Sequence, residues 1–479
     1  MTIAHLPDAE SPSALARIKD VFGRQRETAL RLRTSTASER IAKIKKLRDA
    51  VVARTEAFYA AGHADFRKPS AEMDLTEILP IVQEANDAIR KVKGWMKPHR
   101  VWPSMAMVGS RGWVQYQPKG RCLIVSPWNY PVNLTFGPLV SAIAAGNTAI
   151  IKPSEMTPNL TRVMGEVVRE VFSEDEVAFF EGDAAVAQAL LDLPFDHIFF
   201  TGSPAIGKVV MAAAAKNLTS VTLELGGKSP TIVDASADLD TATQNILWGK
   251  YTNDGQTCIA PDHVYVHRSV KDAFVQKARA ALTRSYGEPA AWKQSADLAH
   301  VVNARHTKRV KALLDDAVSR GAKVVIGGEV DESACFVAPT LLEDIPADAK
   351  IMEEEIFGPL LPIISFDDVD EVIRKVNADP KPLALYMWSK TQKNIDRVLE
   401  QTSSGGACVN TTVVQFIHGN LPFGGVNNSG IGNAHGHYGF KAFSHERAVV
   451  RPQISMVSFF FPPYTDRVKK MIKMLLKLV

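Results

Sequence analysis

Cysteine is scarce in this chain. Only four occur in 479 residues, and each stands alone, with no CxxC pair and no nearby pair of histidines: Cys122, Cys258, Cys335 and Cys408. This spacing excludes the common zinc-site patterns and offers no disulfide framework, so no metal site is predicted. A reducing compartment is the simplest setting for such a protein.

Long apolar runs and blocks of like charge are also missing. No uninterrupted apolar stretch approaches the ~18 residues that a membrane span needs. The stretch Met1–Glu10 carries two acids and no apolar signal core. The net charge of +4 is small for the length, which argues against nucleic acid as a partner. We therefore expect a cytoplasmic protein, with roughly three domains from length alone.

The region before about residue 100 has the pattern of packed helices. Thr36–Glu39 has the spacing of a capping box, and Ile41, Ile44, Leu47 and Val51 follow at helical intervals. Between Ser104 and Gln117 the pattern changes. Short apolar or alternating runs flank Gly109–Gly112 there, which predicts a hairpin ribbon that bridges domains or subunits.

Strand-like and helix-like segments then alternate, which predicts parallel strands joined by crossover helices. The expected strands include Cys122–Ser126, Thr148–Ile151, His197–Thr201 and Val221–Leu225, with a helix at Ala205–Lys216. The alternation recurs later, at Ala322–Ile326 and Leu361–Ser365. The predicted fold class is therefore α/β, with two such units in tandem, a helical start and a ribbon-like appendage.

The stretch Tyr251–Pro261 is where we expect the chemistry. Cys258 lies there between small polar residues and an apolar run, a setting in which a thiol can be partly exposed and held by backbone. The alternative is a small buried apolar residue, which is what most free cysteines are. Cys122 and Cys408 lie in apolar strands and are expected in the core, and Cys335 in a loop.

Two further stretches follow predicted strands and carry polar groups suited to catalysis. In Pro127–Pro131, two prolines fix the backbone around Asn129, whose amide could point at a reacting oxygen. In Leu223–Gly227, Glu224 stands among apolar residues, so a raised pKa and a general-base role are plausible. The alternative for Glu224 is a buried, paired structural carboxylate.

Other strand ends carry groups suited to a nucleotide. Gly202–Gly207 opens a helix, whose amide groups favour a phosphate, although its two glycines do not make the GxGxxG fingerprint. Lys152 and Glu155 add a cation and a carboxylate suited to ribose hydroxyls. An ordinary tight turn and solvated loop charges are the alternatives.

Together these stretches resemble the aldehyde dehydrogenase superfamily from about residue 100 to 450. Seven motifs carry the resemblance in order: Pro127–Asn129, Ile151–Glu155, Phe200–Ser203, Leu223–Pro230, Gly255–Cys258, Glu354–Pro359 and Pro422–Gly425. The short N-terminal region, Pro382–Tyr386 and Phe443–His445 are similar to the class 3 branch. Gly255–Asp262 and Pro462–Tyr464 are similar to coniferyl aldehyde dehydrogenases.

The resemblance implies two tandem Rossmann-type α/β domains and a β-ribbon oligomerisation arm. The implied divisions are a helical part of the cofactor domain (1–100), a bridging hairpin (101–118), an NAD(P)-binding domain (119–227), a catalytic domain (228–415), and a return to the cofactor domain with an oligomerisation strand and amphipathic helix (416–479).

The resemblance also implies roles. Cys258 would attack the aldehyde carbonyl, Asn129 and the Cys258 backbone N–H would hold the oxyanion, hydride would pass to the nicotinamide, and Glu224 would activate water against the thioester. The implied cofactor-binding residues are Trp128, Lys152, Ser154, Glu155, Gly202, Ser203, Gly207, Leu225, Gly226, Glu355 and Phe357. Because the Glu155 carboxylate would repel a 2′-phosphate, NAD is the expected cofactor, with NADP as the alternative.

The sequence constrains the substrate less than it constrains the reaction. Tyr130 and Trp248, as expected pocket residues, favour an aromatic aldehyde such as coniferaldehyde or a medium-chain apolar one; a general fatty aldehyde dehydrogenase is the alternative. Acyl transfer to coenzyme A and a catalytically silent nucleotide-binding protein are further readings. Departures from the family pattern are Asn427 in place of glycine, Ala434 in place of tyrosine, and Gln415 where histidine is frequent. Asparagine tolerates a left-handed backbone, so the turn at 427 could survive.

The C-terminal region suggests partners besides the aldehyde. The ribbon and the apolar run Ile454–Phe461, expected as a strand, would pair in a homodimer, as the resemblance implies. The stretch Val468–Val479 interleaves lysines with apolar residues, which predicts a basic amphipathic helix. Such a helix could cover an apolar patch of its own protein, shape the substrate funnel, or make peripheral contact with a membrane.

Overall fold

The computed structural model describes residues 12–104, 107–454 and 457–477. The N-terminal part is helical, as predicted: α1 (Pro12–Leu32), α2 (Ala37–Val52), α3 (Thr55–Phe66), α4 (Ser70–Met73), a π-helical turn (Asp74–Ile78) and α5 (Leu79–Trp95). The predicted capping box opens α2, because the Thr36 hydroxyl accepts from the Glu39 N–H while the Glu39 carboxylate accepts from the Thr36 N–H.

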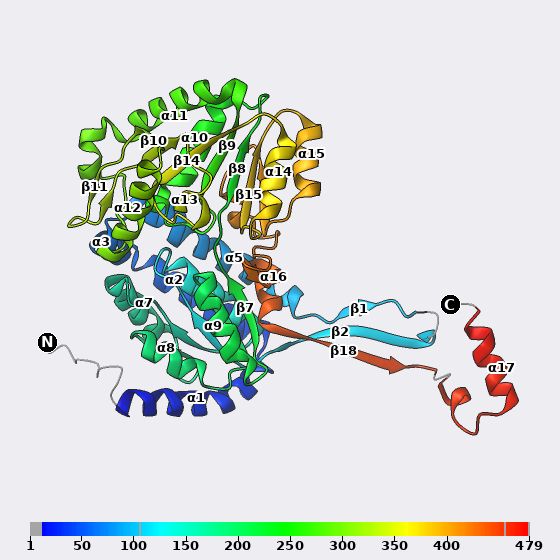
Figure 1. Cartoon of the computed structure of the whole chain (residues 1–479). Helices are drawn as coiled ribbons and strands as arrows, with labels where there is room; N and C mark the ends of the chain where they lie inside the picture. Colours follow the sequence, from blue (N-terminus) through cyan, green and yellow to red (C-terminus); the bar gives the residue numbers. More distant parts are fainter. Residues whose placement is uncertain (1–11, 105–106, 455–456, 478–479) are drawn as a thin grey trace.

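A six-stranded sheet holds the first α/β unit, in the order β17-β7-β6-β3-β4-β5 (Figure 1). Its strands are β3 (Arg121–Val125), β4 (Thr148–Lys152), β5 (Val177–Phe179), β6 (His197–Thr201), β7 (Ser220–Glu224) and β17 (Gly430–Ile431). All neighbours are parallel except β17, which returns antiparallel to β7. The four strands predicted in this region are thus confirmed.

Helices cover both faces of this sheet, because alternate strand residues point to opposite sides. Cys122 and Ile124 pack with α2, α5, α6 (Asn133–Ala145) and α7 (Pro158–Val171). Leu123 packs on the other face with α1, α8 (Ala184–Leu191) and α9 (Pro204–Ala215).

A seven-stranded sheet holds the second α/β unit, in the order β10-β13-β14-β9-β8-β15-β16. Its strands are β8 (Pro230–Val233), β9 (His263–His267), β10 (Lys323–Ile326), β13 (Thr340–Glu343), β14 (Leu360–Phe366), β15 (Ala384–Trp388) and β16 (Gly406–Val409). The accompanying helices are α10 (Leu239–Tyr251), α11 (Lys271–Tyr286), α12 (Ala304–Ser319), α13 (Lys350–Glu353), α14 (Val369–Ala378) and α15 (Gln392–Gln401). Only β10 is antiparallel to its neighbour, and β11 (Val330–Asp331) and β12 (Phe336–Val337) form a separate small hairpin.

An arm of three strands projects from the body between the two sheets (Figure 1). It consists of β1 (His99–Val101), β2 (Ser110–Pro118) and β18 (Ser444–Pro452), with β2 in the middle. The predicted ribbon is therefore present, but of the predicted turn Gly109–Gly112 only Gly109 lies outside the strands, because β2 begins at Ser110. Gly112 pairs with Val101 inside the sheet, and the connection lies before β2. A Cβ on Gly112 would approach Val101 to 3.0 Å, so close packing within the arm accounts for that glycine.

The chain end differs from expectation. The predicted strand Ile454–Phe461 is wrong, because β18 ends at Pro452 and Val457–Phe460 forms a 3₁₀ turn; residues 455–456 lie outside the described residues. The predicted basic helix is present as α17 (Asp466–Leu475), and residues 478–479 are not described. No residue of α17 is buried, and Figure 1 places it beyond the end of the arm, so it does not cover the main body of its own chain. Among the described residues, no helix combines the length and apolarity that crossing a membrane requires.

Candidate active site

The loop that carries Cys258 runs from α10 to β9 through a strained 3₁₀ turn, Thr252–Gly255. Asn253 and Asp254 have left-handed backbones, with φ of +56° and +55°. Gly255 follows with φ of +71°, and a Cβ there would lie 2.3 Å from the Gly358 carbonyl oxygen. Backbone N–H groups of Cys258 and Ile259 face the thiol. The loop is thus built around close backbone contacts that present the thiol to an adjacent cavity.

Asn129 is fixed against this loop. Its side chain is buried, and its Nδ2 donates to the Gln256 carbonyl at 2.9 Å. The Asn253 amide in turn donates to the Asn129 carbonyl at 2.9 Å, and the Gln256 side chain donates to the carbonyls of Asn253 and His300. This hydrogen-bond network holds Asn129 against Gln256, which precedes Cys258 by two residues. Sequence patterns did not predict the network.

Glu224 ends β7 and lines the same cavity as Cys258. Its side chain is buried, and neither carboxylate oxygen has a hydrogen-bond partner among the described residues. Burial raises the pKa of Glu224 well above its usual range, as its apolar neighbours in the sequence predicted. The alternative reading, a paired structural carboxylate, does not fit this environment.

The cavity shared by Cys258 and Glu224 is small, at about 150 Å³, and its walls are mainly apolar. Both predicted pocket residues line it: Trp248 from α10, and Tyr130, whose hydroxyl lies 2.5 Å from that of Thr257. Further apolar wall residues were not predicted: Leu75, Leu79, Leu134, Pro138, Val413, Phe416, Ile417 and Phe423. The i, i+4 spacing of Leu75 with Leu79 marks one helical face but does not say what that face meets.

Two carboxylates influence the pKa of the Cys258 thiol. Burial is the largest effect and the carboxylates of Glu355 and Glu224 add to it, so the pKa of Cys258 rises to about 12. Burial, reinforced by Asp262, also raises the pKa of Glu355 to about 8. The Glu355 carboxylate lies so close to Gly226 that a Cβ there would be 2.4 Å from Oε2, which explains why position 226 is glycine.

The predicted cofactor residues gather at one edge of the six-stranded sheet. Lys152 ends β4, Ser154 and Glu155 follow it, Gly202 and Ser203 follow β6, and Leu225 and Gly226 follow β7. Because these strands are parallel, their carboxyl ends share one edge, and β3 lies between β4 and β6 where the strand order reverses. Such switch points are where α/β sheets bind nucleotides.

The residues at this edge fit a dinucleotide. Ser203 caps the amino end of α9, where free backbone N–H groups favour a phosphate. Gly207 brings α9 onto the sheet, since a Cβ there would lie 2.7 Å from the Leu225 side chain. The Lys152 ammonium lies 2.9 Å from the Glu155 carboxylate, so this edge also carries a polar pair.

Trp128 and Phe357 lie together, with their ring centroids 5.3 Å apart and nearly perpendicular. Trp128 also packs against His306, at 5.0 Å between centroids. The structure thus links the segment after β3 to the Glu354–Pro359 motif, and both sequence stretches reach the space between the two α/β units.

The structure shows the surroundings of the three residues that depart from the family pattern. Asn427 has φ of +55°, so asparagine does hold the left-handed turn in place of glycine. Ala434 lines the catalytic cavity, as expected for a residue near the substrate. Gln415 instead binds two inner side chains: its Oε1 accepts from the Cys408 thiol at 3.0 Å, and its Nε2 donates to the Tyr386 hydroxyl at 3.2 Å.

Comparison with known proteins agrees with this arrangement. Residues 2–449 match the Aldehyde dehydrogenase family. AldX of Bacillus subtilis is 48% identical over 432 residues, 90% of this chain and 97% of that protein. A probable coniferyl aldehyde dehydrogenase of Caulobacter vibrioides is 40% identical over 467 residues, 95% of this chain and 96% of its own. The solved structure of Staphylococcus aureus AldH in a substrate-bound state superposes with a TM-score of 0.91 at 39% identity, covering 96% of this chain and 99% of that one.

Proposed function

The chain belongs to the aldehyde dehydrogenase family, and from this premise we propose that Cys258, Asn129 and Glu224 together oxidise an aldehyde to a carboxylic acid. The observation that carries the proposal is the shared cavity, which is lined both by the thiol and by a buried carboxylate that has no hydrogen-bond partner among the described residues. When bound, the nicotinamide of NAD(P) accepts the hydride that leaves the aldehyde carbon.

Cys258 is the proposed nucleophile. A thiol adds readily to a carbonyl and leaves readily from a thioester, so one difficult oxidation divides into two easier steps. With a pKa of about 12, the thiol needs a base when it reacts, and Glu224 is the carboxylate without a partner in the same cavity. Proton transfer from the thiol to Glu224 is therefore the proposed first event.

Asn129 and the backbone N–H of Cys258 are the proposed oxyanion donors. One hydrogen of the Asn129 amide is engaged with the Gln256 carbonyl, which leaves the second for a ligand. Because the amide is locked before substrate arrives, it stabilises developing charge without reorganising.

Glu224 is also the proposed base for the second half of the reaction, after the proton it took from the thiol has passed to solvent. Its raised pKa makes it a good proton acceptor, and its carboxylate has no competing hydrogen bond. A water molecule that loses its proton to Glu224 would attack the thioester on Cys258 and release the acid. A base in this position would have no purpose in acyl transfer to coenzyme A.

We propose NAD as the preferred form of the cofactor. Glu155 lies after β4 with its side chain 48% exposed, where its carboxylate would repel a 2′-phosphate. Lys152 offsets part of this charge, so NADP is disfavoured rather than blocked.

We propose an aromatic aldehyde such as coniferaldehyde, or a medium-chain apolar one, as substrate. Tyr130, Trp248 and Phe423 line the cavity, and a relative named as a probable coniferyl aldehyde dehydrogenase matches nearly the whole chain. The second candidate is a general aliphatic aldehyde dehydrogenase, favoured by the aliphatic side chains of Leu75, Leu79 and Ile417 in the same walls.

The test is reduction of NAD and of NADP by the pure protein, followed by absorbance. Coniferaldehyde, benzaldehyde, hexanal, decanal and succinic semialdehyde form the panel, and product analysis with and without coenzyme A identifies the acyl acceptor. Turnover confined to the aromatic members supports the first candidate, and broad turnover with decanal supports the second. Cofactor binding without turnover on any member would overturn the proposal in favour of a silent nucleotide-binding protein.

We also propose a cytoplasmic homodimer. The four cysteines are free thiols, which supports a reducing compartment. The arm leaves large apolar side chains exposed, Trp102 at 97% and Val450 at 56%, as expected of a surface that meets another subunit. A monomeric mass in solution would contradict the proposed dimer.

The role of α17 is tested by truncation after Tyr464. Loss of vesicle binding with unchanged substrate preference would favour membrane contact over a role in the substrate funnel.

A further inference from the structure

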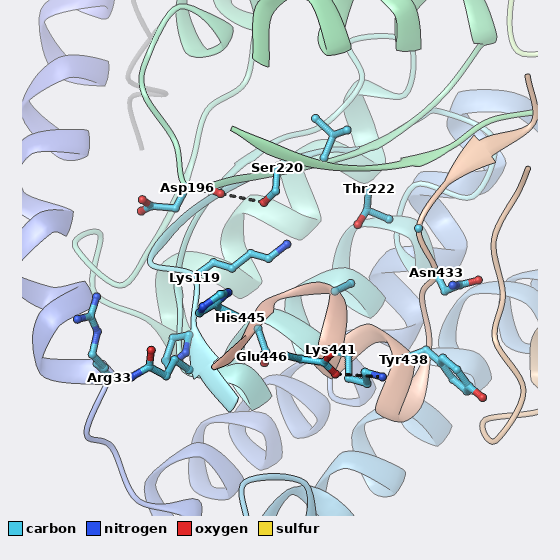
Figure 2. Close-up of a pocket in the computed structure, with 16 residues that line it drawn as sticks. Arg33, Lys119, Asp196, Ser220, Thr222, Asn433, Tyr438, Lys441, His445 and Glu446 are labelled. Carbon is cyan, nitrogen blue, oxygen red and sulfur yellow. Dashed lines mark hydrogen bonds and ion pairs between the residues drawn. The ribbon is translucent and has the colours of Figure 1, made fainter. Parts of the chain in front are cut away.

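A second cavity, of about 900 Å³, lies at the opposite edge of the six-stranded sheet from the catalytic residues. Its walls come from the amino ends of the strands, from the base of the arm and from α16 (Gly436–Ala442) (Figure 2). His197 and Ser220, the first residues of β6 and β7, pair across this edge. No role proposed above uses this cavity.

Lys119 extends into the middle of this cavity (Figure 2). Its backbone N–H donates to the Phe443 carbonyl at 3.3 Å, which fixes it at the junction of the arm and the sheet. No carboxylate of the described residues forms an ion pair with its ammonium, whose polar contact is Nδ1 of His197 at 3.1 Å. Burial lowers the pKa of Lys119, as expected for a cation that lacks a countercharge.

His197 does not supply that countercharge. It is fully buried, and burial together with the Lys119 ammonium lowers its pKa well below the usual range, so the ring stays neutral. Ser220 and Thr222 hold the ring, with contacts of 3.0 Å to Nδ1 and 3.3 Å to Nε2. A neutral imidazole held in this way can accept one hydrogen bond from Lys119, which leaves the other two ammonium hydrogens without a protein acceptor among the described residues.

The two carboxylates that line the cavity are engaged elsewhere. Asp196 turns away from Lys119 and accepts the backbone N–H of Arg121 at 2.7 Å. Glu446 pairs with Lys441 at 3.1 Å. Arg33, on another wall, has no hydrogen-bond or ion-pair partner for its guanidinium among the described residues. The partly buried ammonium of Lys119 and the exposed guanidinium of Arg33 thus line the cavity, and no anion of the described residues pairs with either of them.

We propose that this cavity is a binding site for a small organic anion, a carboxylate or a phosphate ester, with Lys119 as its principal cation and Arg33 as the second. An anion there would satisfy the free ammonium hydrogens and the guanidinium through charge-assisted hydrogen bonds. The cavity has room for the organic part of such a molecule beside Tyr438 and Asn433.

Labelling with pyridoxal 5′-phosphate tests the site on the full chain, because this probe joins a phosphate to an aldehyde that reacts with amines. The lysine nitrogen bonds to the aldehyde carbon and water leaves; borohydride then adds hydride to that carbon, solvent protonates the nitrogen, and the link becomes permanent. Peptide mass spectrometry locates the label. Pyridoxal, which lacks the phosphate, is the matched probe, and Lys381, an exposed lysine with no ion pair or hydrogen bond of its side chain among the described residues, is the internal control.

We expect Lys119 to be labelled before Lys381, and about tenfold more readily by pyridoxal 5′-phosphate than by pyridoxal, since a charge-assisted hydrogen bond contributes that order of binding. Arg33→Gln should reduce this preference, and Lys119→Gln should remove the label from the cavity while leaving Lys381 labelled. Competition by inorganic phosphate or by citrate distinguishes a phosphate site from a carboxylate site. Labelling that follows exposure alone, with Lys381 ahead of Lys119 and no competition by either anion, would overturn the proposal. The readout is independent of dehydrogenase activity.

Discussion

Replacing Glu224 by glutamine separates the two halves of the proposed reaction. The amide keeps the shape of the side chain but cannot accept a proton, so water should no longer be activated against the thioester. A positioned general base contributes roughly 100- to 10,000-fold to a rate, so steady-state turnover should fall by about that factor. The first half should be slowed, because Glu224 is also the proposed base for the thiol, but it should still deliver one equivalent of reduced cofactor per active site as the thiol loses its proton to solvent.

Rapid mixing of Glu224→Gln with NAD and benzaldehyde should therefore show a burst of absorbance followed by a slow phase, and intact mass spectrometry should find the acyl group on Cys258. Glu355→Gln is the matched control. Both carboxylates raise the pKa of the Cys258 thiol, so Glu355→Gln shares this electrostatic effect but keeps the proposed base, and only Glu224→Gln should accumulate the acyl enzyme. Steady-state turnover within a few-fold of the unmodified protein, or no acyl group on Cys258, would refute the assigned role.

We also predict how Glu224→Gln changes the pH dependence of stability, and the sign of this change follows from the burial of Glu224. The folded state raises the pKa of Glu224 above its usual 4.5, so folded protein holds this proton more tightly than unfolded protein does. That contribution is present below pH 4.5 and is lost as the pH rises through the raised value. Glutamine cannot ionise, so Glu224→Gln should lose less stability than the unmodified protein between mildly acidic and neutral pH. Thermal melting across that range measures it, and parallel pH profiles would contradict it.

Three further predictions concern other parts of the chain. Cys258→Ala should abolish aldehyde oxidation while melting as the unmodified protein does, and retained oxidation would rule out the nucleophile. Glu155→Gln should raise kcat/KM with NADP relative to NAD by about tenfold, the order of one removed charge contact, and an unchanged ratio would mean that Glu155 does not face the 2′ position. Lys68→Met should cost about 3–5 kcal/mol of unfolding free energy, because it leaves the fully buried carboxylate of Glu77 without its ion-pair partner, the Lys68 ammonium at 2.9 Å. Chemical denaturation measures that loss, and Lys68→Met/Glu77→Gln should recover part of it.

Sequence patterns predicted the strands of the first sheet well because each is a short apolar run between clear turn residues. His197–Thr201 has the predicted bounds, and Glu224 has the apolar surroundings that its neighbours indicated. The apolar run 454–461 has a similar composition but no strand partner for 457–460, which form a 3₁₀ turn. Composition records how apolar a segment is, whereas a strand also needs a neighbour to accept its hydrogen bonds.

The hydrogen bonds that hold the site residues in place could not be predicted from sequence patterns, for a different reason. Asn129 and Gln256 are far apart in sequence, and each is an unremarkable polar residue until the fold joins them through a 2.9 Å hydrogen bond. The cavity around Lys119 likewise requires the sheet, the arm and α16 to meet. Local patterns indicate which residue types could do chemistry, but only long-range contacts decide which charges remain without a partner.

The two edges of the six-stranded sheet differ in the sign of their unpaired ionisable groups. At the carboxyl edge, Glu224 has no hydrogen-bond partner among the described residues, and Glu355, when ionised, adds negative charge beside a thiol whose pKa is raised to about 12, so the site is unfavourable for a thiolate as it stands. The oxidised nicotinamide carries positive charge, which would offset these carboxylates and favour ionisation of Cys258 only when the hydride acceptor is present. At the amino edge, Lys119 and Arg33 present the opposite sign. We therefore interpret each edge as half of an interaction whose other half is a ligand: the oxidised nicotinamide at the carboxyl edge and an anion at the amino edge.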